Sequence, residues 1–279
     1  MNGTEISTDS IETFIKKLVK ESSLNKLSIS EGGPIFDDPI FGIADGHDLL
    51  FTKYKQIIGG FHLTPDEVLQ RTAQAEQYKG TLEDVSVVCW VLPFVERIRS
   101  SNGIKKDLPA SELWTRGQRD GEKLNDNLRE QLVRFFRNRG YLAIAPMRSP
   151  LYVRIGRYET NWSERHALYT AGMGTFGLSR WLITKRGVAM RCGSVVANAG
   201  LKPTPRPYTS QTEYCLYYSS GSCDKCINRC PAGAITSDGL NKVRCREYLD
   251  VHATVEGCGR CQTGVPCEAG IPNTVNSVN

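Results

Sequence analysis

Residues 84–93 read DVSVVCWVLP. The run is short and almost wholly apolar, and four of its ten residues are valine. Valine is β-branched and fits extended backbone, so this composition is typical of a strand that is buried on both faces of a sheet. We therefore expect residues 84–93 to form a buried strand inside a layered fold.

Helical and extended patterns alternate along the first two-thirds of the chain. Apolar residues recur at helical spacing over 11–19, after Asp9-Ser10 as the expected cap, and again over 124–136, stopping before Gly140. Other expected elements are a helix opened by Thr64-Pro65-Asp66-Glu67, a helix from the cap Ser163 to about residue 169, and strands at 141–145, 181–184 and 194–196. This alternation predicts an α/β (α+β) fold.

The length and composition suit one large domain and an appendage. The chain has 279 residues, of which 40% are hydrophobic. No run of about 18 apolar residues occurs, and the opening MNGTEISTDSIETF lacks a basic-then-apolar signal region. We therefore expect a cytoplasmic protein with no membrane partner, in which thiols serve metal or redox chemistry rather than disulfides.

The cysteines divide the chain into two regions. Two of the ten, Cys89 and Cys192, stand alone and are interpreted as buried small hydrophobic residues. The other eight all fall in residues 206–279, which carry equal numbers of acidic and basic residues, so the net charge of +5 belongs to 1–205. A proline-rich connector at 202–207 separates the regions. We expect an α/β domain at 1–205 and a small cysteine-rich domain at 206–279.

The spacing of the eight cysteines indicates iron–sulfur chemistry. Cys223-x2-Cys226-x3-Cys230-Pro231 reproduces most of the bacterial ferredoxin run C-x2-C-x2-C-x3-C-P, in which the cysteine before proline binds a second cluster. Ser220 stands where that run has its first cysteine, so we expect Cys215 to replace it through a longer loop. A short helix is expected after Pro231.

Eight thiolates are the number that two [4Fe–4S] clusters need. Ferredoxin-like crossing divides the eight cysteines into two sets of four ligands. One set is Cys215, Cys223, Cys226 and Cys267, and the other is Cys230, Cys245, Cys258 and Cys261. The downstream spacing, Cys258-x2-Cys261-x5-Cys267, departs from the usual pattern. Zinc is the alternative, because two C-x2-C pairs can form a site of four thiolates, although such a site uses only four of the eight cysteines.

The chain resembles the epoxyqueuosine reductases and reductive dehalogenases, cobalamin-type iron–sulfur reductases. The likeness lies in the cysteine-rich tail and in ERHALYTAGMGTFG (164–177), followed by Leu182-Ile183-Thr184 and Gly193-Ser194-Val195-Val196. It implies a nitroreductase-like domain followed by a dicluster ferredoxin-like domain, with electrons passing through two clusters to cobalamin. The positions in this chain that it implies for cofactor binding are Arg165, Gly172, Gly174, Gly177, Leu182, Thr184 and Gly193.

Other interpretations of the 165–212 segment remain open. Gly172-x-Gly174-x-x-Gly177 follows a helix instead of a strand, and no acidic residue occurs from Arg165 to Thr212, so a dinucleotide-binding motif is disfavoured. The seven cations of this acid-free stretch suit either an anionic partner or a solvated basic face. The glycines suit either a flat cofactor or a packing turn.

The reaction is less well defined by the sequence. Epoxyqueuosine reductases carry an Asp general acid in a segment that corresponds to 145–152 here, where no carboxylate occurs. Proximity in sequence makes Tyr152, Arg154, Tyr158 and Glu159 the candidate catalytic residues. We expect an iron–sulfur oxidoreductase that reduces a small or nucleoside-like substrate and receives electrons from a ferredoxin or flavodoxin. The alternatives are an electron-transfer or partner-binding protein that has lost corrinoid-dependent catalysis, and a protein that binds tRNA.

Overall fold

The computed structural model describes residues 6–29, 32–103, 110–252 and 257–273. The helices are α1 (Thr8–Glu21), α2 (Leu49–Ile57), α3 (Pro65–Glu76), α4 (Glu96–Gly103), α5 (Glu112–Arg137), α6 (Glu164–Thr170), α7 (Leu216–Ser220), α8 (Lys225–Arg229) and α9 (Lys242–Val251), with a 3-10 turn at Pro146–Arg148. The strands are β1 (Ile40–Asp45), β2 (Ser86–Pro93), β3 (Ala143–Ile144), β4 (Arg154–Ile155), β5 (Glu159–Thr160), β6 (Gly174–Phe176), β7 (Leu182–Thr184), β8 (Met190–Ala197), β9 (Ile235–Thr236) and β10 (Gly239–Leu240).

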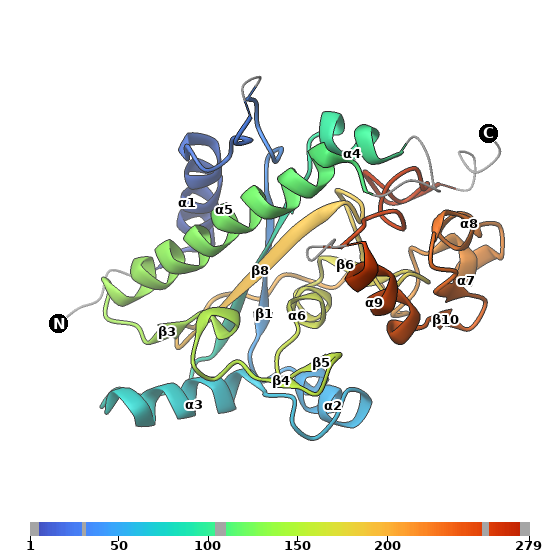
Figure 1. Cartoon of the computed structure of the whole chain (residues 1–279). Helices are drawn as coiled ribbons and strands as arrows, with labels where there is room; N and C mark the ends of the chain where they lie inside the picture. The colour runs from blue at the N-terminus through green and yellow to red at the C-terminus, as the bar shows by residue number, and fades with distance from the viewer. Residues whose placement is uncertain (1–5, 30–31, 104–109, 253–256, 274–279) are drawn as a thin grey trace.

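A four-stranded sheet forms the centre of the molecule, in the order β1-β2-β8-β3 (Figure 1). Each neighbouring pair is antiparallel, and Cys89 of β2 lies opposite Gly42 of β1 and Ser194 of β8. All eight residues of β2 are buried, as the apolar run predicted. The expected mixture of helices and strands is confirmed, and the antiparallel pairing places the fold on the α+β side of that expectation.

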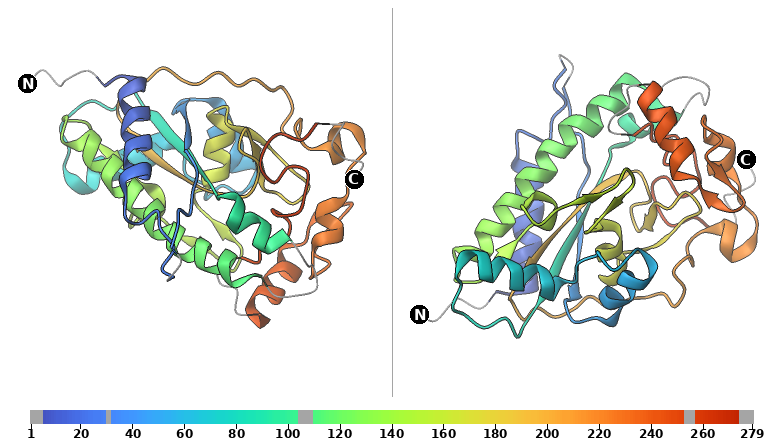
Figure 2. Two further views of the ribbon diagram at one scale, coloured as in Figure 1. Left: turned by 90° about the horizontal axis from the view of Figure 1, so that it is seen from above. Right: turned by 60° about the horizontal axis from the view of Figure 1, so that its bottom comes forward.

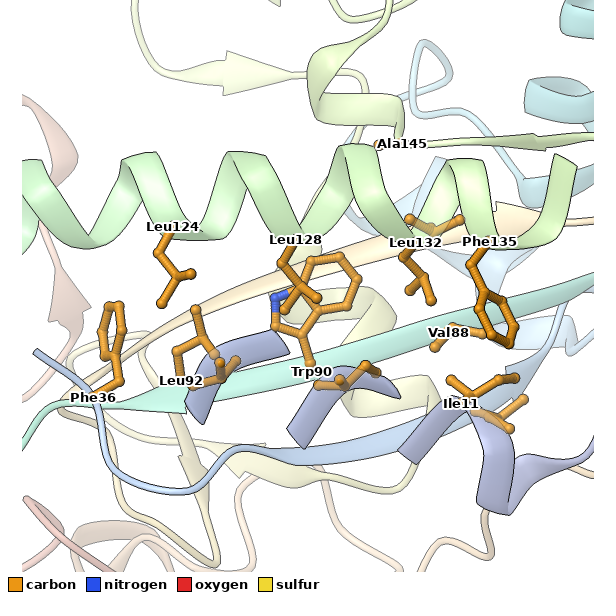
Figure 3. Close-up of a cluster of buried hydrophobic side chains, with 14 of the residues drawn as sticks. Ile11, Phe36, Val88, Trp90, Leu92, Leu124, Leu128, Leu132, Phe135 and Ala145 are labelled. Atoms are coloured by element: carbon orange, nitrogen blue, oxygen red, sulfur yellow. The ribbon is translucent and has the colours of Figure 1, made fainter. Parts of the chain in front are cut away.

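Alternate residues of β2 face two separate cores, because side chains alternate across a strand. Val88, Trp90 and Leu92 pack against α1 and α5, where Leu124, Leu128 and Leu132 point at the sheet (Figure 3). On the opposite face, Val87, Cys89 and Val91 pack with residues of α2, α3 and α6. The sheet is therefore the middle of three layers, which fixes where α6 and the ends of β2 and β8 lie.

A third core belongs to the cysteine-rich tail, which lies on the opposite side of the molecule from α1 (Figures 1 and 2). Ile235 and Val265 of the tail pack with Leu178, Ile183 and Val188, which come from the β6–β7 hairpin and the turn after it. The main chain joins them too, since Val188 N donates to Cys267 O at 2.9 Å. The tail is thus anchored on a hairpin that precedes residue 205 in the sequence.

Two local expectations need correction, and the connector has a more specific position than the sequence indicated. Helix α1 is capped by Ser7, whose side chain accepts from Ser10 N, and not by Asp9 or Ser10. The short helix expected after Pro231 is absent from the described residues there; helix α8 lies before the proline, and Ile235 after it pairs into the β9–β10 hairpin. The connector at 202–207 is packed on the edge of the sheet, because Thr204 N donates to Ile43 O at 2.8 Å.

Candidate functional site

Four of the eight tail cysteines surround one cavity. Cys215, Cys223, Cys226 and Cys267 all line it, and they come from the start of α7, from α8 and the loop before it, and from the last described segment. The rest of the lining is mainly apolar: Gly177, Leu178, Ser179, Ile183, Leu216, Tyr217, Val265, Pro266 and Pro272. We call these four residues the first cysteine group; they coincide with one of the two ligand sets predicted from the spacing.

The thiols of the first cysteine group lie close enough to influence one another's ionisation. Burial, together with negative charge at Cys215 and Cys223, raises the pKa of Cys226 to about 12. Burial and the same neighbours, with Cys226, also raise the pKa of Cys267. Without a metal the thiols of Cys226 and Cys267 are therefore protonated at neutral pH, and metal binding at these two residues must release their protons.

The remaining four cysteines form a second group beside the first. Burial raises the pKa of Cys245 to about 11, with added contributions from Cys258 and Cys230. Burial also raises the pKa of Cys261 strongly, and all three other members act on it, followed by Cys226 of the first group. We call Cys230, Cys245, Cys258 and Cys261 the second cysteine group.

The donor set fits a polynuclear cluster. In the first cysteine group, four cysteines from separate segments line one cavity, and a [4Fe–4S] cluster is held by four cysteine thiolates. Across residues 6–29, 32–103, 110–252 and 257–273, no three His, Cys, Asp or Glu side chains converge closely enough to bind a single metal ion. The two groups are the residues that would hold two [4Fe–4S] clusters.

Asn102 at the end of α4 attaches the second cysteine group to the large lobe. Its buried side chain donates to Cys258 O at 3.0 Å and to Thr263 Oγ1 at 3.2 Å, and accepts from Ser111 N. Its own carbonyl accepts from Arg229 and Arg260 of the tail. Trp114 of α5 adds a hydrogen bond from its indole to Gly257 O at 3.3 Å.

The glycines predicted to bind a cofactor approach the chain itself. A β-carbon at Gly172, whose φ is +73°, would lie 2.5 Å from Pro205 O. One at Gly174 would overlap Ile183 O in β7, and one at Gly193 would overlap the indole of Trp90. Gly177 differs, because it lines the cavity of the first cysteine group. Close packing therefore accounts for the absence of a side chain at three of the four glycines.

The other three predicted cofactor residues have different surroundings. Leu182 is buried in the core that the sheet forms with α2, α3 and α6. Thr184 is also buried, and its hydroxyl donates to Gly187 O at 2.9 Å. Arg165 donates to Arg180 O at 2.7 Å, and its guanidinium lies 5.1 Å from the centre of the Trp181 ring. Burial lowers the pKa of Arg165, and negative charge at Cys192 and Cys261 opposes this.

Glu164, which precedes Arg165 in the family-like segment, holds α6 against the sheet and α5. Its carboxylate pairs with buried Arg129 at 3.4 Å and accepts from the hydroxyl of Ser194, which in turn accepts from Trp162 Nε1. Arg129 also pairs with Asp126 at 2.8 Å. Burial raises the pKa of Glu164, and Arg129 opposes that rise. This network explains the motif residue as a tether between three elements.

The four predicted catalytic residues lie on or next to the β4–β5 hairpin. Arg154 pairs with Thr160 and Ile155 with Glu159, so Arg154 and Glu159 occupy opposite faces of the hairpin, and both are exposed. Tyr158 is at the turn, beside the guanidinium of Arg157 at 5.8 Å. Tyr152 is half-buried against the core that the sheet forms with α2, α3 and α6. The structure does not bring these four side chains to one point.

Sequence reasoning missed several residues that shape the site. Arg229 and Arg260 are visible as the residues next to Cys230 and between Cys258 and Cys261, and that adjacency is the signal that could have selected them. Asn102 gives no comparable signal, since it lies in a short polar helix more than a hundred residues before the cysteines. Its role follows only from the tertiary contact.

The fold is similar to that of solved epoxyqueuosine reductases. No family model matches the chain. It resembles a solved selenomethionine-labelled epoxyqueuosine reductase with a TM-score of 0.51 and 17% identity, covering 96% of this chain and 67% of that one. A structure of epoxyqueuosine reductase with a tRNA-Tyr epoxyqueuosine-modified tRNA stem loop gives a TM-score of 0.50 at 17% identity, with 96% and 67% covered. The fold expected from the resemblance is thereby confirmed.

The sequence comparison agrees with the structural one. Epoxyqueuosine reductase of Lactococcus garvieae (strain Lg2) is 28% identical over 116 residues, which cover 36% of this chain and 30% of that protein. The catabolic reductive dehalogenase NpRdhA, in complex with 3-bromo-4-hydroxybenzoic acid, aligns with a TM-score of 0.48 and 14% identity, covering 95% of this chain and 37% of that one. The chain thus spans about two-thirds of the solved epoxyqueuosine reductases. In the described part of the chain, no helix is both long and apolar enough to cross a bilayer.

Proposed function

We propose that this chain is an iron–sulfur oxidoreductase that binds two [4Fe–4S] clusters in residues 206–279 and passes single electrons into the domain of residues 1–205. The observation that carries the proposal is the grouping of eight cysteines into two sets of four, one of them around a cavity. When bound, such clusters accept and release one electron at a time. The chain's own contribution is to hold eight thiolates in place and to shield them.

The contacts of the tail support electron transfer toward the sheet. Cys258 is held through its carbonyl by Asn102, and Cys261 lies near Arg165 at the start of α6. Arg165 is in turn near Cys192 of β8. The second cysteine group therefore faces the large lobe, where a site for reduction would have to lie.

The resemblance supports a more specific version, in which the electrons reach a cobalamin-type cofactor that reduces a small or nucleoside-like substrate. Arg165, Gly177 and Thr184 would then lie near that cofactor. Because Gly172, Gly174 and Gly193 pack against the chain itself, we assign no reaction step to a corrinoid. The same packing favours a second candidate function, an electron-transfer or partner-binding protein without corrinoid-dependent catalysis.

The partners follow from the same proposal. A low-potential one-electron donor such as ferredoxin or flavodoxin would reduce the clusters. A small molecule is the substrate that the chain's own site would take. One related structure contains a tRNA stem loop, so tRNA is the alternative substrate, with the cations of the acid-free 165–212 segment as its expected contacts.

The test is the metal content of protein purified and reconstituted without oxygen. We expect about eight iron and eight acid-labile sulfide per chain, because each cluster contains four of each. Cys226→Ala and Cys245→Ala, one from each group, should each lose about half of the iron. Cys89→Ala is the matched control: this buried thiol lies in β2, away from both groups, and the variant should keep all of the iron.

Zinc in place of iron, or disulfides among these cysteines, would contradict the proposal. Adding cobalamin to the reconstituted protein then separates the two versions. Equimolar corrinoid that remains bound through gel filtration supports the corrinoid-dependent reductase. Intact clusters without bound corrinoid support the electron-transfer protein.

A further inference from the structure

The two cysteine groups have different electrostatic surroundings. Apart from the cysteines, the described residues that line the cavity of the first group include no acidic or basic side chain, and the polar ones are Ser179 and Tyr217. A cluster held there would be surrounded mainly by leucine, isoleucine, valine and proline. Apolar surroundings penalise any added charge, because they solvate it poorly.

Arginines lie next to the second group. Arg229 immediately precedes Cys230, and Arg260 lies between Cys258 and Cys261. Negative charge at Cys258 and Cys261 acts on the guanidinium of Arg229, and negative charge at Cys258 acts on that of Arg260. Arg229 Nε also donates to Arg260 O, which lies between Cys258 and Cys261, so its guanidinium lies against the loop that carries these two cysteines.

Hydrogen bonds fix the position of these cations. Arg229 donates to Gly103 O at 2.9 Å, to Asn102 O at 3.0 Å and to Arg260 O at 3.2 Å. Arg260, which is 3% exposed, donates to Asn102 O at 2.5 Å. Burial lowers the pKa of both arginines. At Arg229, negative charge at Glu268 and the cysteines opposes this fall, whereas at Arg260 the charge of Arg229 lowers the pKa further. The charges thus stay in place and are only partly screened by water.

We propose that Arg229 and Arg260 set the second cysteine group as the higher-potential electron site of the pair, so that electrons move from the first group to the second and then toward the sheet. This rests on the proposed function. Reduction adds one negative charge to a cluster, and a nearby fixed cation stabilises that charge, so the reduction potential rises. The external one-electron donor supplies the electron, the first cluster is reoxidised as it passes the electron on, and the second is reduced.

The experiment is a redox titration of the reconstituted full chain, followed by the cluster signals in electron paramagnetic resonance. The wild-type protein should show two one-electron couples at different potentials. Cys245→Ala, which removes a ligand of the second group only, should retain the lower couple. Cys245→Ala therefore shows which couple belongs to which cysteine group without changing either arginine, and the result does not depend on whether an arginine variant folds.

Arginine variants then test the cause of the difference. Arg229→Met should lower only the higher couple, by at least a tenfold change in its reduced-to-oxidised ratio at fixed potential, or about 59 mV for one electron. Arg229→Lys keeps the charge and should restore most of the shift. Lys225→Met is the matched control, because this exposed lysine adjoins Cys226 of the first group, and it should leave the higher couple unchanged.

Three results would overturn the inference while the clusters remain. They are a single shared potential in the wild-type protein, retention of the higher couple in Cys245→Ala, and an equal shift of both couples in Arg229→Met. A preparation that contains no iron would instead refute the proposed function itself. Iron content, measured on each sample, distinguishes the two kinds of failure.

Discussion

His62 is a buried imidazole that the candidate site does not use. Its side chain is 1% exposed and stacks on Trp162, with ring centroids 6.3 Å apart. Burial, assisted by the charge of Lys55, lowers its pKa from 6.5 to about 4. Because the unfolded chain then binds the proton more readily than the folded one, stability is full above pH 6.5 and falls as the pH drops toward 4. The expected loss is about 3 kcal/mol in total.

Urea unfolding between pH 4 and pH 7 measures this effect. His62→Leu removes the group, so its stability should vary less over that range; some slope should remain, because burial also lowers the pKa of neighbouring His166 to about 3. A His62→Leu profile parallel to the wild type would be inconsistent with a neutral buried imidazole.

The sequence predicts the start of helix α3 more clearly than that of any other helix discussed above. Thr64 Oγ1 accepts from Glu67 N at 3.3 Å, and Glu67 Oε2 accepts from Thr64 N at 2.9 Å, which completes a capping box with Pro65 in the first turn. Thr64→Ala should lower the free energy of unfolding by about 1 kcal/mol, because it removes the cap acceptor. Thr64→Ser keeps the hydroxyl and should cost much less. Denaturant midpoints measure both, and equal loss in the two variants would argue against the cap.

Elements defined by nearby residues could be predicted, and elements defined by distant contacts could not. The periodicity of α5 and the apolar run of β2 lie within one segment, so both were predicted in place. Strand β1 was missed because its apolar residues surround Gly42 and because it depends on pairing with β2. Ile235 shows the reverse error: alanines nearby favour helix, but burial in the tail core and pairing with Leu240 decide for strand.

The candidate site divides in the same way. The spacing of Cys223, Cys226 and Cys230 is local, and a known ligand pattern predicts that the first two belong to one cluster and Cys230 to the other. Cys267 lies about forty residues further along the chain; ferredoxin-like crossing predicted it in the first group, and the structure holds it there with a hydrogen bond from Val188 N to Cys267 O. The contacts of Asn102 with Arg229 and Arg260 follow from no spacing pattern in the sequence, because they form only when the tail packs on α4.

One buried amide contributes several of the hydrogen bonds that attach the tail to the large lobe. Asn102 is fully buried, and its side chain joins Cys258 O, Thr263 Oγ1 and Ser111 N, while its main chain receives both arginines of the second cysteine group. Removing the amide in Asn102→Ala leaves two acceptors and one donor without these bonds, at a cost of about 2–4 kcal/mol. We expect the loss to fall on the junction and not on the sheet.

Hydrogen exchange resolves where stability is lost, since local opening is read segment by segment. In Asn102→Ala, residues 257–263 and the end of α4 should exchange faster, while β2 and β8 keep their protection because their pairing does not involve this amide. Asn228→Ala removes an exposed amide from α8 and should leave the junction unchanged. Uniformly faster exchange throughout the sheet would mean that Asn102 stabilises the whole fold, and unchanged exchange at 257–263 would mean that the tail is held by its apolar core alone.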